Sequence, residues 1–184
     1  MIKNVNYQIV YFRRIVYYIN IGRYMENIIE IKDSKIITDI LNTSFMTIAL
    51  KFGLTKENAP NHPAFIGSDT IENQLIKGLK MYGYASNDQI VGCVGYWTDN
   101  NETYHIERLA TLPEHRHSGI GKKLMEFAEG KIMNNGGKIA EIHVLDKNTT
   151  LIEWYKKLKY AEIRIDELKH LPFNSCVMNK TLIL

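Results

Sequence analysis

The spacing of hydrophobic residues switches along the chain between a two-residue and a three-to-four-residue period, which predicts alternating strands and helices. Residues 27–31 read as a short strand. From Ser34, which we expect to cap the next helix, apolar residues then recur at helical spacing: Ile36, Ile37, Ile40, Leu41, Phe45 and Ile48. A loop with prolines at 56–67 precedes a second helix, where Asp69 and Glu72 have the spacing of a capping box.

The middle of the chain has the pattern of three strands, at residues 81–86, 89–97 and 103–112, separated by turn residues. Such short turns favour consecutive antiparallel hairpins. After Pro113 the pattern predicts a helix, a strand, a shorter helix and two strands, at residues 120–134, 138–145, 148–160, 161–165 and 174–182. The chain from Met25 to Leu184 therefore predicts one mixed α/β domain.

Composition changes this picture little. The chain has 184 residues, 45% hydrophobic and 23% charged, which suits one globular domain with a proper core. A net charge of +3 is too small to indicate nucleic acid binding. Cys93 and Cys176 lie in apolar segments without metal-like spacing, so we expect buried free thiols in a reducing, cytoplasmic compartment in preference to a disulfide or a metal site.

Residues 1–24 differ from the rest because they are rich in Tyr, Ile and Arg. Arg13 and Arg14 interrupt the apolar run, so it is too short for a membrane span or a signal-peptide core. We expect an N-terminal extension, with Met25 as the natural start and 25–184 as the domain. The alternative is a basic, aromatic segment that lies on a membrane surface.

The segment after Pro113 joins positive charge, glycine and a helix start. The residues concerned are Arg116, His117, Gly119, Gly121, Lys122 and Lys123. Unpaired N–H groups and the helix dipole make such a start an anion site that suits phosphate. It is not an ATP-binding P-loop, because Arg116 stands where that motif needs Gly and Lys123 where it needs Ser or Thr. Nor are the glycines in the order of a dinucleotide fingerprint.

Residues 116–121, Arg-His-Ser-Gly-Ile-Gly, resemble the R/Q-x-x-G-x-G/A signature of the GNAT superfamily of N-acetyltransferases. The context agrees, since a strand precedes the signature and an amphipathic helix follows it. Residues 148–160 are also similar to the family segment N-x-x-x-x-x-[LW]-Y-x-x-x-G-F. Two residues depart from the family pattern: Ser118 replaces a residue that is commonly basic or glycine, and Lys159 replaces the usual glycine.

The resemblance implies an α/β fold with a mixed, mostly antiparallel sheet of about seven strands and helices on both faces. It also implies that the fourth and fifth strands, 103–112 and 138–145, splay apart around the co-substrate acetyl-CoA. By the same match, the backbone of residues 109–111 pairs with pantetheine, residues 117–122 hold the pyrophosphate, and Asn148 contacts pantetheine. The implied binding residues are Leu109, Ala110, Thr111, Arg116, His117, Ser118, Gly119, Ile120, Gly121, Lys122 and Asn148.

The chemistry needs a base for the acceptor ammonium ion. Strand alternation predicts one shared face for four residues: His105, Glu107, Leu109 and Thr111. We expect Glu107 to be the base and His105 the second choice, unless Glu107 merely pairs with an Arg or Lys and His105 is a half-buried structural residue. Tyr155 matches the family tyrosine that protonates the CoA thiolate, and its alternative is a core aromatic beside Trp154.

The other histidines lack metal-ligand spacing, so we expect loop or surface roles and no metal site: His62, His115, His143 and His170. The sequence thus predicts acetyl transfer from acetyl-CoA to a primary amine by direct attack in a ternary complex. The acceptor is a small-molecule or peptide amine, contacted by the early helices and residues 59–65, without nucleic acid or membrane partners. The sequence leaves open whether the protein forms a homodimer. It also leaves two alternative functions open: a non-catalytic acetyl-CoA-binding module, and an acyltransferase for another acyl-CoA or a protein N-terminus.

Overall fold

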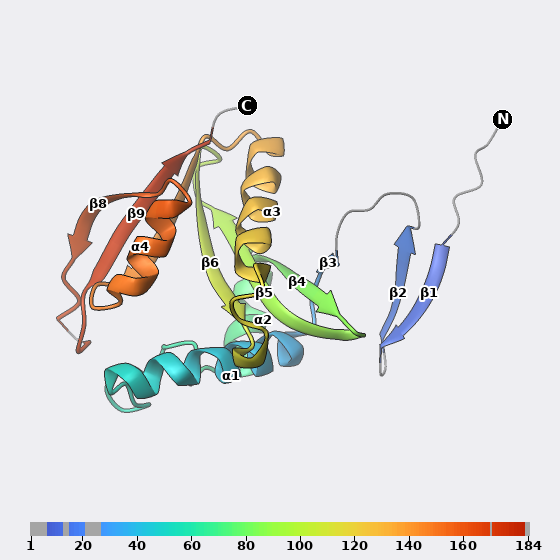
Figure 1. Cartoon of the computed structure of the whole chain (residues 1–184), viewed down its shortest axis with the longest axis horizontal. Helices are drawn as coiled ribbons and strands as arrows, with labels where there is room; N and C mark the ends of the chain where they lie inside the picture. The colour runs from blue at the N-terminus through green and yellow to red at the C-terminus, as the bar shows by residue number, and fades with distance from the viewer. Residues whose placement is uncertain (1–6, 13–14, 21–26, 170, 183–184) are drawn as a thin grey trace.

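The computed structural model describes residues 7–12, 15–20, 27–169 and 171–182 (Figure 1). Its elements, in chain order, are β1 (Tyr7–Phe12), β2 (Ile15–Asn20), β3 (Ile28–Glu30), α1 (Ser34–Phe52), α2 (Ser68–Ile76), β4 (Lys80–Ser86), β5 (Gln89–Thr98), β6 (Thr103–Thr111), a 3-10 turn (Pro113–His115), α3 (Ile120–Asn134), β7 (Ile139–Leu145), α4 (Thr149–Lys157), β8 (Ala161–Asp166) and β9 (Ser175–Thr181). None of the helices in these ranges is long and apolar enough to cross a lipid bilayer.

A seven-stranded sheet organises the chain, in the order β3-β4-β5-β6-β7-β9-β8. The pair β6–β7 is parallel and the other neighbours are antiparallel, which confirms the predicted meander and the mostly antiparallel sheet. Strands β1 and β2 form a two-stranded antiparallel sheet of their own. Met25 lies outside the described residues, so the natural start stays a prediction.

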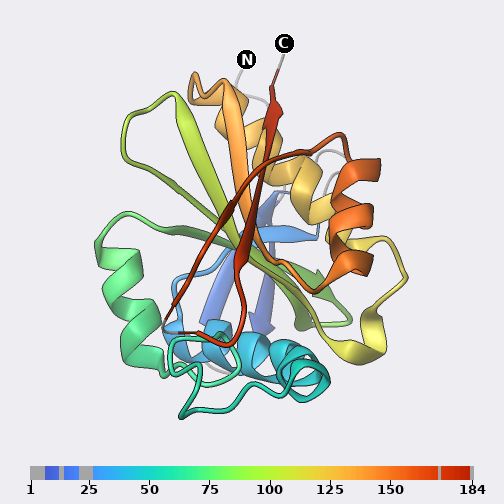
Figure 2. The same cartoon turned by 90° about the vertical axis from the view of Figure 1, so that its left-hand side faces the viewer.

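Helices cover both faces of the sheet, as predicted. In Figure 2, α2 (green, left) lies across the strands from α3 and α4 (gold and orange, right). Ile37 and Leu41 of α1 pack with Ile71 of α2 in one buried cluster, which we call the α1-side core. Leu124 and Ala128 of α3 belong to a second cluster, the α3-side core. Burial of these side chains on each face of the sheet supplies the main driving force for folding.

Helix α1 begins one residue earlier than the sequence pattern predicts. Asp33 is its N-cap, and the Asp33 carboxylate accepts hydrogen bonds from the backbone N–H groups of Lys35, at 2.9 Å, and Ile36, at 3.1 Å. The predicted cap at Ser34 is therefore wrong. The carboxylate prevails because it satisfies two of the unpaired N–H groups of the first turn and carries the charge that this end of a helix favours.

The predicted capping box of Asp69 and Glu72 is also wrong. Gly67 is the N-cap of α2 and makes no side-chain cap bond, so Asp69 lies inside the first turn. A Cβ at position 67 would require the Asp69 carboxylate to move.

Strand β6 contains a bulge. Its pairing with β5 passes from Glu107↔Gly95 to Ala110↔Cys93, so β6 has one residue more than its partner between these two pairs. Arg108 accommodates the extra residue with a φ of 57°, in the left-handed region. For a residue with a Cβ this conformation costs about 1–2 kcal/mol.

The bulge exchanges the two faces of β6. Ile106 belongs to the α3-side core, whereas Ala110, four residues further on, belongs to the α1-side core. In a regular strand the two side chains would share a face, because the period is two. The residues that follow the bulge therefore point opposite to the predicted direction.

Candidate active site

The sheet opens between β6 and β7. The two strands pair in parallel only where they begin, at Thr103↔Ile139, Tyr104↔Ala140 and His105↔Glu141. Residues 106–111 of β6 and 142–145 of β7 have no such pairing, which confirms the predicted splay between these strands. We call this unpaired region the splay. Backbone groups of β6 that would complete a ladder there are available to a ligand.

The turn from β6 into α3 presents a row of unpaired N–H groups. His117 and Gly119 have φ values of 61° and 84°, and α3 begins at Ile120. Among the described residues, no backbone carbonyl or side chain accepts a hydrogen bond from the N–H groups of residues 117–122. The Ser118 side chain makes a local hydrogen bond, because its hydroxyl donates to the carbonyl oxygen of His115 at 2.5 Å. A helix start of this kind attracts phosphate.

Arg116, next to this turn, makes structural hydrogen bonds. Its Nε donates to the carbonyl oxygen of Thr111, at 3.3 Å, and its Nη2 donates to that of Ser44 in α1, at 2.7 Å. The guanidinium, predicted among the acetyl-CoA-binding residues, therefore ties the 3-10 turn to α1. Its positive charge still lies beside the turn of residues 117–122, which we call the phosphate turn.

The predicted common face of His105, Glu107, Leu109 and Thr111 is wrong, because the bulge separates these residues. Leu109 packs on the α3-side core, and a Cβ on Gly121 of α3 would lie 3.9 Å from the Thr111 hydroxyl oxygen. His105 and Glu107 precede the bulge and alternate with Ile106, so they face α1 and α2. The two candidate bases thus lie on the opposite face of β6 from the side chains of Leu109 and Thr111, whereas Ala110 faces the same side as the bases.

Glu107 contacts an arginine, the pairing that the sequence left open as an alternative to a role as the base. Its carboxylate is 33% exposed, and Oε1 lies 3.6 Å from Nε of Arg108. The Arg108 side chain is only 12% exposed, and its Nε is buried without a hydrogen-bond partner. In a regular strand Arg108 would point away from Glu107. The contact exists because of the bulge, so the alternation of the strand could not predict it.

His105 belongs to a polar group that the sequence also concealed. Its Nδ1 lies 3.4 Å from Oε1 of Glu141, and Nε2 of His143 lies 3.2 Å from the same oxygen. His143 is exposed, which agrees with its predicted surface role, but the β6–β7 register brings it together with His105 and Glu141. Their ligand atoms are close enough to hold a metal ion. The ring of Trp97 stacks on His105 at 4.3 Å, and Nη1 of Arg164 lies 3.6 Å from Oε2 of Glu141, as in an ion-pair network.

Tyr155 lies on α4, beside the start of α3. A Cβ on Gly121 would be 3.7 Å from Cζ2 of Trp154, so the two helices meet at the phosphate turn. Burial raises the pKa of the Tyr155 phenol well above its usual range, so it stays protonated at neutral pH. Asn148 is buried at the N-cap of α4 and makes no side-chain cap bond, which leaves its amide available.

His62 lies in the loop between α1 and α2, on the α1 side of the sheet. Burial, and secondly the charge of Arg108, lower its pKa to about 4. The backbone N–H of Ala64 donates to Nδ1, at 3.3 Å, which requires an unprotonated nitrogen there. The ring of Phe45 packs edge-on against it, with centroids 5.7 Å apart. His62 is therefore neutral in the folded protein.

This neutral histidine predicts a loss of stability in acid. The folded pKa of about 4 lies below the ordinary value of 6.5, so the unfolded chain takes up the proton first. We expect the contribution of His62 to be fully present above pH 6.5 and lost as the pH falls towards 4. Thermal midpoints from pH 8 to 4 should decline less in His62→Asn, which keeps a hydrogen-bond acceptor, than in the wild type. Equal declines would contradict the assignment.

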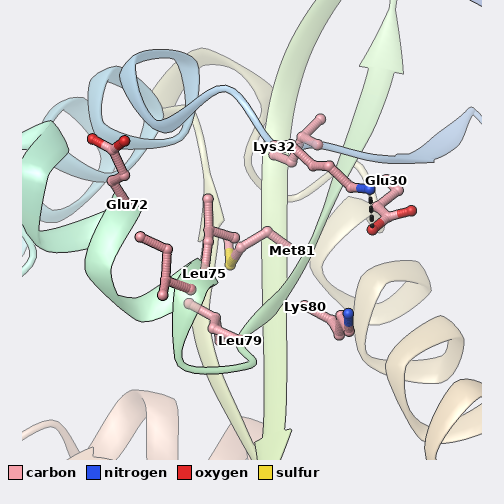
Figure 3. A pocket seen from close by; sticks show the side chains of 9 residues that line it. Glu30, Lys32, Glu72, Leu75, Leu79, Lys80 and Met81 are labelled. Atoms are coloured by element: carbon pink, nitrogen blue, oxygen red, sulfur yellow. Dashed lines mark ion pairs between the residues drawn. The ribbon is translucent and has the colours of Figure 1, made fainter.

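A separate shallow cavity of about 370 Å³ lies at the β3 edge of the sheet. It is lined by residues of β3, α2 and β4, including Leu75 and Met81, and by the ion pair of Lys32 Nζ with Glu30 Oε1 at 3.5 Å (Figure 3). Strands β4 and β5 separate β3 from β6. No predicted site residue lines this cavity, so the splay and the phosphate turn remain the candidate site.

Comparison with known proteins identifies the family that this chain matches. Residues 49–160 match the model of the acetyltransferase (GNAT) family, a range that includes the splay, the phosphate turn and α4. A curated relative is an uncharacterized N-acetyltransferase of Chlorobaculum tepidum, 28% identical over 108 residues. That alignment covers 58% of this chain and 66% of the relative, slightly less than two thirds of its length.

Solved structures share the fold. The ribosomal-protein-S18-alanine N-acetyltransferase from Escherichia coli has a TM-score of 0.68 at 13% identity, with coverage of 85% of this chain and 94% of that one. A GNAT family acetyltransferase from Elizabethkingia anophelis with acetyl-CoA bound has a TM-score of 0.56 at 18% identity, with coverage of 61% and 82%. At these identities the likeness concerns the fold.

Proposed function

The chain belongs to the acetyltransferase (GNAT) family, and from this premise we propose that it transfers an acetyl group from acetyl-CoA to a primary amine. The observation that carries the proposal is the row of unpaired N–H groups at residues 117–122 beside the splay. Binding an anion there would pair donors that the fold itself leaves without acceptors.

The residues that we propose to bind the cofactor surround this row. The backbone of Leu109, Ala110 and Thr111 borders the splay, where an extended pantetheine arm can take the place of a strand. The N–H groups of residues 117–122 would hold the pyrophosphate, and the free amide of Asn148 would meet the pantetheine. These residues fit acetyl-CoA for two reasons. The N–H donors of residues 117–122 suit its phosphates, and the extended backbone of residues 109–111 suits its peptide-like arm.

Proton transfer is divided between the two faces of β6. On the α1 side, Glu107 first accepts the proton that the ammonium ion must lose to become a free amine, with His105 as the second choice. The amine nitrogen then attacks the thioester carbon, the C–S bond breaks, and the departing sulfur takes a proton from the Tyr155 hydroxyl. The Tyr155 phenolate regains a proton from the acetylated nitrogen, directly or through water. In this proposal the leaving sulfur lies on the α3 side of β6, near Tyr155, and the amine approaches the thioester carbon from the α1 side.

The function is tested by CoA release from acetyl-CoA across polyamines, amino acids, aminoglycosides and peptides. Thiol release with at least one amine supports the transferase. Acetyl-CoA binding without release for any of them would indicate a non-catalytic module. Release that is faster with a longer acyl-CoA would indicate a different acyl donor.

Glu107→Gln is expected to lower the rate about 100-fold at neutral pH, the lower range for loss of a general base. The rate should recover partly as the pH rises, because a more basic solution supplies free amine. The measurement is kcat/KM against pH, with His105→Gln as the matched control. If Glu107→Gln keeps full turnover at every pH while His105→Gln loses it, the base is His105.

A further inference from the structure

Arg108 is a mostly buried cation with few partners. Its side chain is 12% exposed, and the contact of Nε with Oε1 of Glu107, at 3.6 Å, is an ion-pair distance and too long for a hydrogen bond. Within the described ranges Nε has no hydrogen-bond acceptor. A guanidinium offers five N–H donors, and buried charged groups are normally hydrogen-bonded. Arg108 therefore needs an explanation beyond packing.

Arg116 provides an internal comparison. It also lies beside the splay, but its Nε and Nη2 donate to the carbonyl oxygens of Thr111 and Ser44. The fold thus uses one arginine for structural hydrogen bonds and leaves Nε of the other without an acceptor among the described residues. The Arg108 side chain instead contacts Glu107, on the α1 side of the sheet.

Two of the titratable neighbours of Arg108 are uncharged. His62 stays uncharged because its pKa is lowered to about 4, and the Cys93 thiol stays protonated because burial raises its pKa to about 12. The Glu107 carboxylate is the negative group in contact. When Glu107 takes a proton from the amine, that charge disappears, and the buried guanidinium then requires another anion.

We propose that Arg108 binds an anionic oxyacid group of the acceptor, so that the acceptor is an amine with a carboxylate close to the reacting nitrogen. This inference rests on the proposed acetyl transfer. A guanidinium matches the geometry of a carboxylate and can bind it through two N–H groups. The 3.6 Å contact between Glu107 and Arg108 places the proton acceptor next to the anion site. The acceptor's nitrogen and carboxylate should therefore be close together, and α- and β-amino acids are the shortest acceptors of this kind.

The test compares amines that differ only in charge. Glycine, L-alanine and β-alanine are each paired with their amides, and kcat/KM for CoA release is expressed per free amine. We expect the wild type to prefer the carboxylates about 100-fold, the scale for a buried charge pair. Arg108→Gln should bring the ratio near one, and Arg108→Lys should keep part of it. The KM for acetyl-CoA should not change in either variant.

The outcomes separate this inference from the proposed function. Acetylation of carboxylates and amides at equal rates would overturn the role of Arg108 and leave the transferase intact. Acetyl-CoA binding without acetylation of any pair would overturn the amino-acid acceptor. Failure to bind acetyl-CoA would overturn the transferase and this inference together. If Arg108→Gln does not fold, the wild-type ratio decides alone.

Discussion

Replacing Tyr155 with phenylalanine is expected to lower kcat about 100-fold or more and to leave acetyl-CoA affinity nearly unchanged. The Tyr155 hydroxyl acts on the sulfur that leaves, so its contribution is made in the transition state and not in the bound ground state. Burial keeps this phenol protonated, which is the form that a general acid requires. The measurement is single-turnover CoA release together with calorimetric titration of acetyl-CoA.

Trp154→Phe is the matched control, because Trp154 lies on the same helix and has no transferable proton. The rings of Trp154 and Tyr155 are in edge-to-face contact, with centroids 4.8 Å apart, so a general packing defect would appear in both variants. A loss of kcat in Tyr155→Phe alone identifies the hydroxyl. Full turnover in Tyr155→Phe would mean that the thiolate is protonated by water.

Gly121→Asp is expected to abolish measurable binding of acetyl-CoA while the fold survives. A Cβ at this position makes only ordinary contacts, the nearest at 3.7 Å from Trp154, so the helix can accept a side chain. The added carboxylate then lies among the N–H groups that would receive the pyrophosphate, and it both occupies and repels that position. Calorimetric titration of a variant with an unchanged circular dichroism spectrum checks this.

Gly121→Asn separates charge from size, because the two side chains have nearly the same shape. Weak but measurable binding in Gly121→Asn, against none in Gly121→Asp, would show that charge dominates. Gly119→Glu is less informative. Gly119 has a φ of 84°, so any side chain there also strains the backbone. Unchanged affinity in folded Gly121→Asp would remove the phosphate-binding assignment.

Local patterns predicted most of the fold, because they report on neighbours along the chain. The apolar period placed α3 and α4, and the glycines with cations placed the helix start at Ile120. The exact first residue of α1 and of α2 was harder to predict, because Asp33, Ser34 and Asp69 all have side chains that can cap a helix.

Long-range features of the site could not be predicted in the same way. Arginine has no preference for the left-handed region, so nothing in the sequence marks a bulge at Arg108. The hydrogen bond from Arg116 to Ser44 joins residues 72 positions apart. The meeting of His105 with Glu141 depends on the register of a parallel pair that a helix separates in sequence. Such contacts follow from the assembled sheet and from no local period.

The short β6–β7 pairing has a consequence for how the molecule opens. Three residue pairs join the β3–β6 half of the sheet to the β7–β8 half, whereas β5 and β6 pair along most of their length. Without ligand, the two halves should form separate units of amide-exchange protection, with early exchange along β7. A pantetheine arm bound in the splay would join them into one cooperative unit, so acetyl-CoA should slow exchange far beyond the residues that it touches.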